Sequence, residues 1–336
     1  MPKKKSLTLQ RVLVLLLAYI MLAVCGGVAA SVLFVPGVIG ANKAAKAVIP
    51  SLKVENVDFD VTSLPQKSTM YARDGSTVIA TFYNQNRIVV PLKKISKTMQ
   101  QAVVAREDRR FWTHAGVDVQ GVMRAFVQTY LVKGSQQGGS SLTQQYVKNV
   151  LLMQAIEDDD SIAQYHATED TIARKIREML ISVQMEKKYS KAEILQGYLN
   201  IAQFGNNLYG VETAAQRYFS VSAADLNVVQ SATIAAITKN PSLYDPLVEE
   251  NQKESENQRN IVLKLMLQEG YITQKQYTEA VNTPLKDTLK AQDVNVGCQD
   301  TGDYAYFCDF VVHRIQNSEE SVSYTHLRAH ETKANL

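Results

Sequence analysis

Cysteine, net charge and phosphate-binding glycine motifs are all scarce in this 336-residue sequence. Its three cysteines, Cys25, Cys298 and Cys308, form no CxxC pair and have no cluster of histidines nearby, which excludes the usual zinc motifs. A net charge of +3 is too small to indicate a nucleic-acid-binding protein, so no nucleic acid is expected as a partner. The glycine-rich stretch 134–141 lacks the Gly-Lys-Ser/Thr of a P-loop.

Charged residues are also missing from residues 12–42. The run VLVLLLAYIMLAVCGGVAASVLFV, residues 12–35, would span roughly 36 Å as a helix, enough to cross a bilayer core. It therefore predicts a transmembrane helix, with a cleaved signal peptide as the alternative, since VAAS at 28–31 resembles a cleavage site. Basic residues precede the run: Lys3, Lys4, Lys5 and Arg11. The positive-inside rule then places the tail 1–11 in the cytoplasm and the remainder of the chain outside.

After the apolar run, the pattern changes twice. Residues 36–67 are polar to mixed and predict a stalk. The alternating stretch 68–90 carries Asp74-Gly75 between apolar runs, which predicts a β-hairpin. From Pro91 to about residue 282 the pattern is helical. The sequence thus predicts a mainly α fold with a small β-hairpin element, preceded by one N-terminal transmembrane helix.

Two helical segments carry notable apolar residues. Asp118 is placed to cap a helix whose apolar residues exceed one narrow stripe: Val122, Met123, Phe126, Val127, Tyr130 and Leu131. Core packing and contact with lipid, as in an interfacial helix, both account for that surface. A second helix is predicted at 171–189, and its apolar side consists of Ile172, Ile176, Met179, Leu180 and Val183.

The stretch VVAREDRRFWTHAGVD, residues 103–118, sets two adjacent carboxylates, Glu107 and Asp108, beside basic residues and the only tryptophan. A solvated turn would not need Phe111 and Trp112 next to it. A fully buried segment would not tolerate the charges without partners, because unpaired buried charge is expensive. The stretch therefore predicts a cleft in which carboxylates lie half-buried against aromatic rings.

A second candidate carboxylate, Glu178, follows Glu107 by 71 residues. Arg174 and Lys175 lie within one helical turn of it, a pattern that in isolation would indicate only a surface salt-bridge cluster. Two carboxylates suit glycosyl chemistry, and a cluster of cations suits a pyrophosphate leaving group. Together with a membrane anchor, these features indicate transfer of a sugar from a lipid pyrophosphate.

Five blocks carry a family resemblance: EDRRFWTHAG (107–116), GGSSLTQQYVKN (138–149), RKIRE (174–178), KAEILQGYLN (191–200) and YGVETAAQRYFS (209–220). In this order they resemble glycosyltransferase family 51, the peptidoglycan glycosyltransferase domain of class A penicillin-binding proteins. The resemblance implies a lysozyme-like glycosyltransferase domain at 68–285. It also implies an enzyme of bacterial cell-wall synthesis that polymerises lipid II into glycan strands and releases undecaprenyl pyrophosphate.

The resemblance also implies roles for individual residues. Glu107 matches the catalytic general base on the acceptor sugar hydroxyl, and Glu178 matches the second catalytic glutamate. Lys148, Arg174 and Lys175 match the groups that face the pyrophosphate. The other substrate-binding positions are Asp108, Phe111, His114, Ser140, Thr143, Gln144, Gln145 and Asn149.

A divalent cation, usually magnesium, is expected at the diphosphate, although no metal ligands are assigned. Lipid II, the growing glycan strand and the membrane are the expected partners, with proteins of cell-wall synthesis or division as further candidates. The expected location is the bacterial cell membrane, with a single span and the catalytic domain outside.

Some features of the family are missing. Class A proteins normally continue into a transpeptidase domain with SxxK, SxN and KTG motifs. SxxK and KTG do not occur here, and SxN occurs only as SEN at 255–257, inside the resembling region. We expect residues 286–321 to be a linker toward a missing domain. The composition shifts at 322–336, where we expect a non-native tail, with an ordinary disordered terminus as the alternative.

Two other functions remain to be weighed. A lysozyme-like lytic enzyme would use Glu107 as an acid to cleave glycan, but it would not need the cations. A non-catalytic membrane scaffold of the cell-wall machinery would have no reason to keep both glutamates.

Nine residues separate Cys298 from Cys308 in GCQDTGDYAYFC, where Gly302 and Asp303 can form a turn. The predicted location outside the membrane permits disulfides, so we expect these two residues to pair. Two free thiols or an intermolecular bond are the alternatives. Cys25 lies in the membrane run and should take no part.

Overall fold

The computed structural model describes residues 64–126, 139–205, 207–292, 296–299 and 301–317. These residues fall into two compact units, one made of residues 169–177 and the other of the remaining described residues. Over these ranges, no helix is long and apolar enough to cross a membrane. The predicted span at 12–35, most of the stalk and the tail at 322–336 lie outside the described residues.

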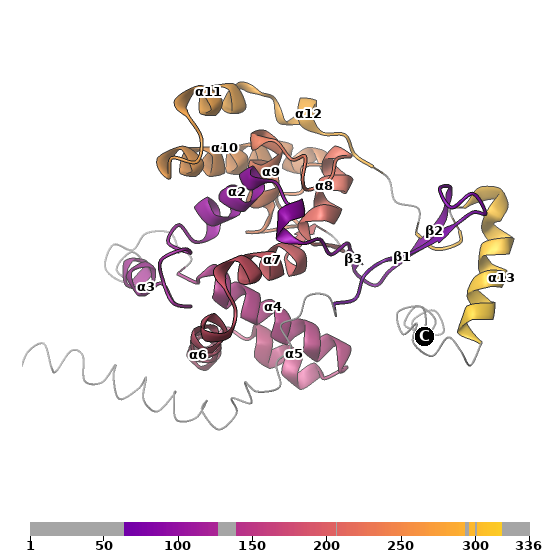
Figure 1. Ribbon diagram of the computed structural model, residues 1–336, viewed down its shortest axis with the longest axis horizontal. Helices are drawn as coiled ribbons and strands as arrows, with labels where there is room; N and C mark the ends of the chain where they lie inside the picture. The colour runs from indigo at the N-terminus through magenta and orange to yellow at the C-terminus, as the bar shows by residue number, and fades with distance from the viewer. Residues whose placement is uncertain (1–63, 127–138, 206, 293–295, 300, 318–336) are drawn as a thin grey trace, which may run out of the picture. The chain divides into compact units, whose positions relative to one another are not determined.

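The described residues are mainly helical, as the sequence predicts (Figure 1). The α-helices are α2 (Lys97–Glu107), α3 (Val119–Phe126), α4 (Leu142–Glu157), α5 (Ser161–Thr168), α6 (Ile172–Lys188), α7 (Lys191–Ile201), α8 (Val211–Phe219), α9 (Val228–Ile237), α10 (Gln252–Gln268), α11 (Gln274–Asn282), α12 (Leu285–Thr288) and α13 (Ala305–Gln316). Short 3₁₀ turns lie at Leu92–Lys94, Glu249–Asn251 and Gly302–Tyr304.

Helix α9 occupies the centre of one helical layer, where it packs against α2 and α10 (Figure 1). Its sequence, VVQSATIAAI, consists mostly of small and apolar residues, and every residue from Ser231 to Ile237 is buried. Small side chains let neighbouring helices approach closely, and the burial of apolar surface then holds them together. A second group of helices consists of α4, α5 and α7, in which α4 packs against the other two. These two groups of helices position the carboxylates described below.

Two small sheets accompany the helices. Strands β1 (Ser68–Tyr71) and β2 (Val78–Phe82) pair antiparallel as the predicted hairpin, and Asp74 accepts hydrogen bonds from the backbone of the turn. The second sheet has the order β3-β5-β4, formed by Asn86–Arg87, Leu208–Tyr209 and Gln203–Gly205. The expectation of an unbroken helical pattern from Pro91 to about residue 282 was therefore wrong at β4 and β5. Strand β5 pairs in parallel with β3, a partner more than 100 residues away, and local periodicity carries no signal of that pairing.

Helix α6 covers the range predicted, but its apolar side is not the side that is buried. An apolar stripe ordinarily faces the core, yet Ile172 is 76% exposed and Leu180 is 37% exposed. The buried residues are Arg174, Glu178, Ile181, Ser182 and Met185. Glu178 is therefore on the buried side of the helix, and charged side chains are rarely fully buried unless they are paired.

Helix α3 is capped as predicted, because the Asp118 carboxylate accepts a 3.1 Å hydrogen bond from the Gly121 backbone N–H. Val119 and Met123 are more than half exposed. Core packing therefore does not account for these two apolar residues. Three residues of the predicted apolar surface, Val127, Tyr130 and Leu131, lie outside the described residues.

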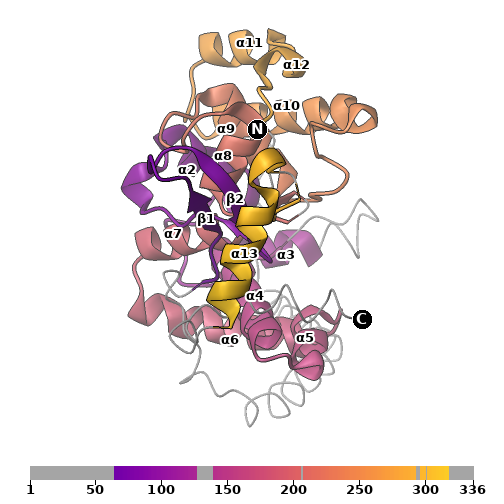
Figure 2. The same ribbon diagram turned by 90° about the vertical axis from the view of Figure 1, so that its right-hand side faces the viewer.

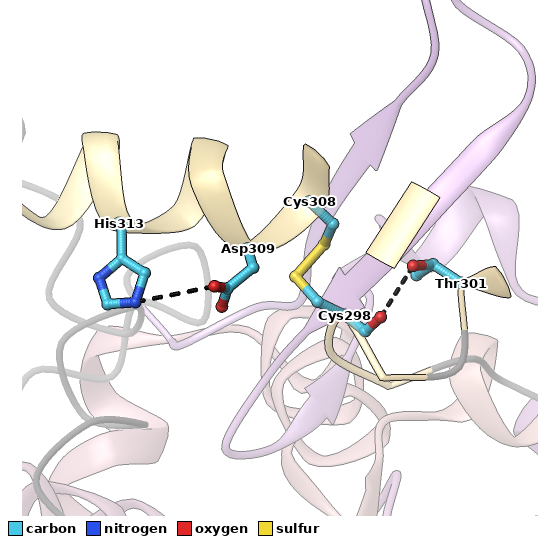
Figure 3. The surroundings of a disulfide bond; sticks show 5 residues. All are labelled: Cys298, Thr301, Cys308, Asp309 and His313. Carbon is cyan, nitrogen blue, oxygen red and sulfur yellow. Dashed lines mark hydrogen bonds and ion pairs between the residues drawn. A yellow bond between two sulfur atoms is a disulfide. The ribbon is translucent and has the colours of Figure 1, made fainter. Parts of the chain in front are cut away.

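The predicted disulfide between Cys298 and Cys308 is present, with the two Cα atoms 5.5 Å apart (Figure 3). The Thr301 hydroxyl donates a 2.8 Å hydrogen bond to the Cys298 carbonyl oxygen inside the closed loop. Cys308 lies on α13, which runs beside the β1–β2 hairpin (Figure 2). The bond thus anchors α13, within the range predicted as a linker, against the hairpin.

Candidate active site

Glu107 is the last residue of α2, and its carboxylate is half-buried. Gln145 on α4 donates a 2.9 Å hydrogen bond from Nε2 to Oε2 of Glu107. The Thr238 hydroxyl, at the end of α9, donates a 2.9 Å hydrogen bond to Oε1. Two donors from two different helices therefore fix the orientation of a carboxylate that solvent still reaches.

Tyr198 on α7 controls the orientation of Gln145. Its hydroxyl donates a 3.2 Å hydrogen bond to Gln145 Oε1, which leaves Nε2 of the same amide pointing at Glu107. Burial, together with the negative charge of Glu107, raises the pKa of Tyr198 well above its ordinary value. The phenol consequently stays protonated and keeps its role as a donor, so the chain of hydrogen bonds runs from Tyr198 to Glu107.

Asp108 is adjacent in sequence but plays a different part, because its side chain is buried. Its Oδ2 lies 2.7 Å from His114 Nε2 and accepts a 3.0 Å hydrogen bond from the Leu142 backbone N–H. A carboxylate only accepts hydrogen bonds, so the imidazole hydrogen is on Nε2. Asp108 thereby joins the loop after α2 to the first turn of α4.

The other side of the His114 ring meets a second polar cluster. Lys191 Nζ lies 3.5 Å from His114 Nδ1 and donates a 2.7 Å hydrogen bond to Glu186. Thr143 donates to the same Glu186 oxygen at 2.5 Å. The Lys191 ammonium also lies 4.6 Å from the centre of the Phe111 ring, a cation–π contact. The loop that follows Glu107 is thus fixed to both α4 and α7.

A glycine brings the same loop against α6. Gly116 has φ +86°, and a Cβ there would lie 2.7 Å from the backbone of Ser182, so only glycine fits. Its carbonyl oxygen accepts a 2.6 Å hydrogen bond from the Ser141 hydroxyl. Ser182 is one turn after Glu178 and donates a 2.7 Å hydrogen bond to the Glu178 carbonyl oxygen. This packing positions the turn of α6 that carries Glu178.

The predicted cations lie on two helices. Lys148 and Asn149 follow Gln145 by three and four residues on α4, so all three share one partly exposed face. Arg174 and Lys175 belong to the separate unit at 169–177. Within that unit Arg174 is buried, donates to the Glu169 carbonyl oxygen and lies 3.9 Å from the Asp170 carboxylate.

Several of the residues expected at the substrate are buried in this structure, and their substrate-binding role stays a prediction. Phe111 and Thr143 are completely buried, and Gln144 is nearly so. Gln144 accepts from the Ser141 backbone N–H as part of the capping box of α4, so its side chain stabilises the helix end. Asp108 and His114 likewise hold the loop. Ser140, in contrast, is half-buried just before this cap.

Four residues of the site escaped the sequence analysis: Tyr198, Lys191, Glu186 and Thr238. The first two lie within the block KAEILQGYLN, so the family resemblance of that block could have pointed to them. Glu186 and Thr238 have no local signature, because only the packing of α6 and α9 brings them to the site.

No group of three or more His, Cys, Asp or Glu residues that could hold a metal ion occurs in the part of the chain that the structure describes.

A mainly helical fold that presents an oriented, half-buried carboxylate and a second glutamate on another helix is typical of enzymes that act on glycosidic bonds. Within that class, the chain belongs to the transglycosylase family, whose model matches residues 75–267, more than half of the chain.

Its relatives among curated proteins are penicillin-binding proteins. Penicillin-binding protein 4 of Bacillus subtilis (strain 168) is 39% identical over 241 residues, which cover 71% of this chain and 36% of that protein. Penicillin-binding protein 1A of Aquifex aeolicus (strain VF5) is 36% identical over 260 residues, 77% of this chain and 32% of that protein. The chain thus spans about a third of the length of these relatives.

Penicillin-binding protein 1A from Haemophilus influenzae, a solved structure, aligns with 23% identity and a TM-score of 0.40, covering 77% of this chain and 25% of that chain.

Proposed function

We propose that this protein is a peptidoglycan glycosyltransferase that polymerises lipid II into glycan strands and releases undecaprenyl pyrophosphate. The transglycosylase family and the penicillin-binding relatives support this assignment. One observation carries it: the Glu107 carboxylate is oriented by Gln145 and Thr238, and the residue is partly exposed.

Glu107 acts as the general base in this proposal. Its carboxylate removes the proton from an acceptor sugar hydroxyl while that oxygen attacks the anomeric carbon of the donor. The new C–O bond forms as the bond between the anomeric carbon and the pyrophosphate oxygen breaks, and the lipid pyrophosphate leaves. A positioned base typically contributes about 10²–10⁴-fold in rate. Glu178 serves as the second glutamate of the same site.

Lys148, Arg174 and Lys175 stabilise the negative charge that develops on the leaving pyrophosphate. Lys148 is favoured by its position one turn after Gln145, on the face of α4 that also carries the contact to Glu107. Asn149 and Ser140 are the other partly exposed candidates for binding lipid II and the glycan strand.

A magnesium ion at the diphosphate is part of the proposal only as a companion of the substrate. Mg²⁺ commonly takes substrate phosphates and one or two carboxylates rather than a complete protein cage. A bound ion would neutralise part of the negative charge of the diphosphate, and the steps above are those of the chain's own residues.

We place the protein in the bacterial cell membrane, anchored by residues 12–35 with the catalytic domain outside. The charge-free run and the basic residues before it support this location. The exposed Val119 and Met123 of α3 support contact of the domain with lipid. Other proteins of cell-wall synthesis or division are proposed as partners on the family resemblance alone.

Lipid II in detergent solution provides the test. The wild-type chain should convert it to glycan strands, and Glu107→Gln should lower that rate by at least about 100-fold. Glutamine keeps the shape of the side chain and loses its basicity, so thermal unfolding should be nearly unchanged. Glu250→Gln, at an exposed position, is the matched control and should retain full activity.

Wild-type turnover by the Glu107→Gln variant would show that Glu107 is not the base. A wild-type chain that leaves lipid II intact but cleaves preformed glycan would identify a lytic enzyme. A chain that does neither would fit a scaffold.

A further inference from the structure

A cavity of about 550 Å³ lies between the β1–β2 hairpin, strand β3 and helix α8. Its lining includes Lys67, Thr69, Asn86, Thr213, Gln216 and Arg217. None of the lining residues belongs to the proposed catalytic set. Its size is in the range of small-molecule sites, which typically measure about 300–1,000 Å³.

The hairpin separates this cavity from the apolar cluster under α13. Thr69 and Tyr71 of β1 line the cavity, whereas Met70 and Ala72 pack against the cluster that contains Cys308. Alternate residues of a strand point to opposite faces of the sheet. One wall of the cavity is therefore the hairpin, whose opposite face packs against α13 and the disulfide.

Positive charge dominates the described part of the lining, which includes Lys67, Arg87 and Arg217 but no aspartate or glutamate. The Arg87 guanidinium donates to the carbonyl oxygens of Asn200 and Pro65 and lies 5.1 Å from the centre of the Tyr209 ring. Burial lowers its pKa to about 10, so it remains charged at neutral pH. Arg87 thus contributes charge, while its hydrogen bonds are already directed into the protein.

Lys67 is different, because its ammonium group forms no hydrogen bond or ion pair with any of the described residues. The carboxylate that influences it is Glu212, whose two oxygens accept 2.7 Å hydrogen bonds from Gln216 Nε2 and the Ala223 backbone N–H. Burial lowers the pKa of Lys67, and the charge of Glu212 opposes that change. A half-buried ammonium at the cavity wall therefore retains unused donor capacity.

Asn86 places an unpaired hydrogen-bond acceptor in the lining of the same cavity. Its side chain is 2% exposed, and Oδ1 has no hydrogen-bond partner among the described residues. Leaving a buried acceptor unpaired is unfavourable, and such groups are rare in folded proteins. A ligand in the cavity that carries an N–H or O–H group would satisfy it.

We propose that this cavity binds a small anionic ligand whose carboxylate or phosphate is held by Lys67, beside the positive charge of Arg87 and Arg217, and whose adjacent donor hydrogen-bonds to Asn86 Oδ1. Two sources share that chemistry. A short peptide with a free C-terminal carboxylate offers backbone N–H donors, and a sugar phosphate offers hydroxyl donors. This site is separate from the catalytic one and does not depend on the proposed function.

Calorimetric titration of the 336-residue chain in detergent with N-acetylalanylalanine and with glucosamine 1-phosphate distinguishes the two sources. Saturable binding of either probe supports the site, and the probe that binds shows whether the ligand is a peptide carboxylate or a sugar phosphate. The C-terminal amide of the peptide, or glucosamine without phosphate, should bind at least about tenfold more weakly, because hydrogen bonds to charged groups are the strong ones. Absence of saturable binding by both probes overturns the proposal, as does equally tight binding of inorganic phosphate, which lacks the sugar or peptide donor.

Variants then locate the site. Lys67→Gln should weaken binding by at least about tenfold, and Lys67→Arg should largely restore it. Lys264→Gln, at an exposed position on α10, is the matched control and should bind as the wild type does. Thermal unfolding of each variant reports whether it is folded. Unchanged affinity in Lys67→Gln overturns the proposal.

A measurement on the wild-type chain avoids any folding defect of the variants. Acetic anhydride labels accessible lysines, and peptide mass spectrometry measures the extent at each position. The bound probe should reduce acetylation of Lys67 and leave that of Lys264 unchanged. Equal acetylation of Lys67 with and without a saturating probe contradicts the assignment.

Discussion

Replacement of Gly197 by alanine should destabilise the protein, although alanine favours helices. Gly197 lies in the middle of α7, and a Cβ at this position would overlap the phenol ring of Tyr146 on α4. Tyr146 is 3% exposed, so it has little space into which to move. The absence of a side chain at Gly197 is what allows α4 and α7 to pack so closely.

Two opposing effects set the magnitude for Gly197→Ala. Alanine is favoured over glycine in a helix interior by up to about 1 kcal/mol. Inserting a methyl group into a packed core typically costs about 1–3 kcal/mol. The upper part of that range applies, since the overlapping atoms are at the phenol end of Tyr146 and this buried ring has little room to move. We expect a net loss of about 1–2 kcal/mol in the free energy of unfolding.

The same substitution should also slow catalysis. Gln145 is the neighbour of Tyr146 and donates to Glu107, so a shift of α4 moves this hydrogen bond. A misplacement of about 1 Å in an active site can lower the rate by about 10²-fold. Denaturant unfolding gives the stability, and lipid II turnover of the folded fraction gives the rate.

A double-mutant cycle isolates the contact between Gly197 and Tyr146. Tyr146→Ala removes the ring and destabilises the protein by itself, but Gly197→Ala should then have little further cost. A stabilisation of about 1 kcal/mol by Gly197→Ala in the wild-type background, as helix propensity alone predicts, would refute the close approach of the two helices. Additive losses in the cycle would refute it as well.

Three further predictions concern the leaving group, the disulfide and the hairpin turn. Lys148→Gln should reduce lipid II turnover by at least about tenfold with less than about 1 kcal/mol lost in unfolding, whereas unchanged kinetics would identify an ordinary surface lysine. Replacing Cys298 and Cys308 by serine should lower local stability by about 2–3 kcal/mol without changing turnover, and non-reducing peptide mapping should find the linked peptide in the wild type. Hydrogen bonds from the Thr77 hydroxyl and from the backbone of Thr77 and Ser76 lower the pKa of Asp74 from 3.8 to about 2. Its support of the turn should therefore be present above pH 3.8 and be lost as the pH falls through about 2; a carboxyl carbon NMR titration with a midpoint near 3.8 would contradict this.

Local sequence determined the features that depend on neighbouring residues. Ser190 and Glu193 have the Ser-x-x-Glu spacing that is typical of a capping box, and this box is present at the start of α7. Asp74-Gly75 marks the hairpin turn, because Gly75 adopts φ +68° and Asp74 hydrogen-bonds to the residues after it. The pairing of Cys298 with Cys308 also follows from a short loop that can close on itself. Glu107 was identified as catalytic from its sequence block, and that role stays a prediction.

Only tertiary structure decided the contacts between distant segments. The hydrogen bond from Thr238 to Glu107 joins residues 131 positions apart, and no local pattern distinguishes this threonine from any other. The buried side of α6 is likewise set by its neighbours, which is why Glu178 is enclosed while the apolar Ile172 is exposed. Helical periodicity states which residues share a face, whereas burial depends on what that face meets. The partner surfaces come from other parts of the chain, so the environment of Glu107 and Glu178 exists only after the helices have packed.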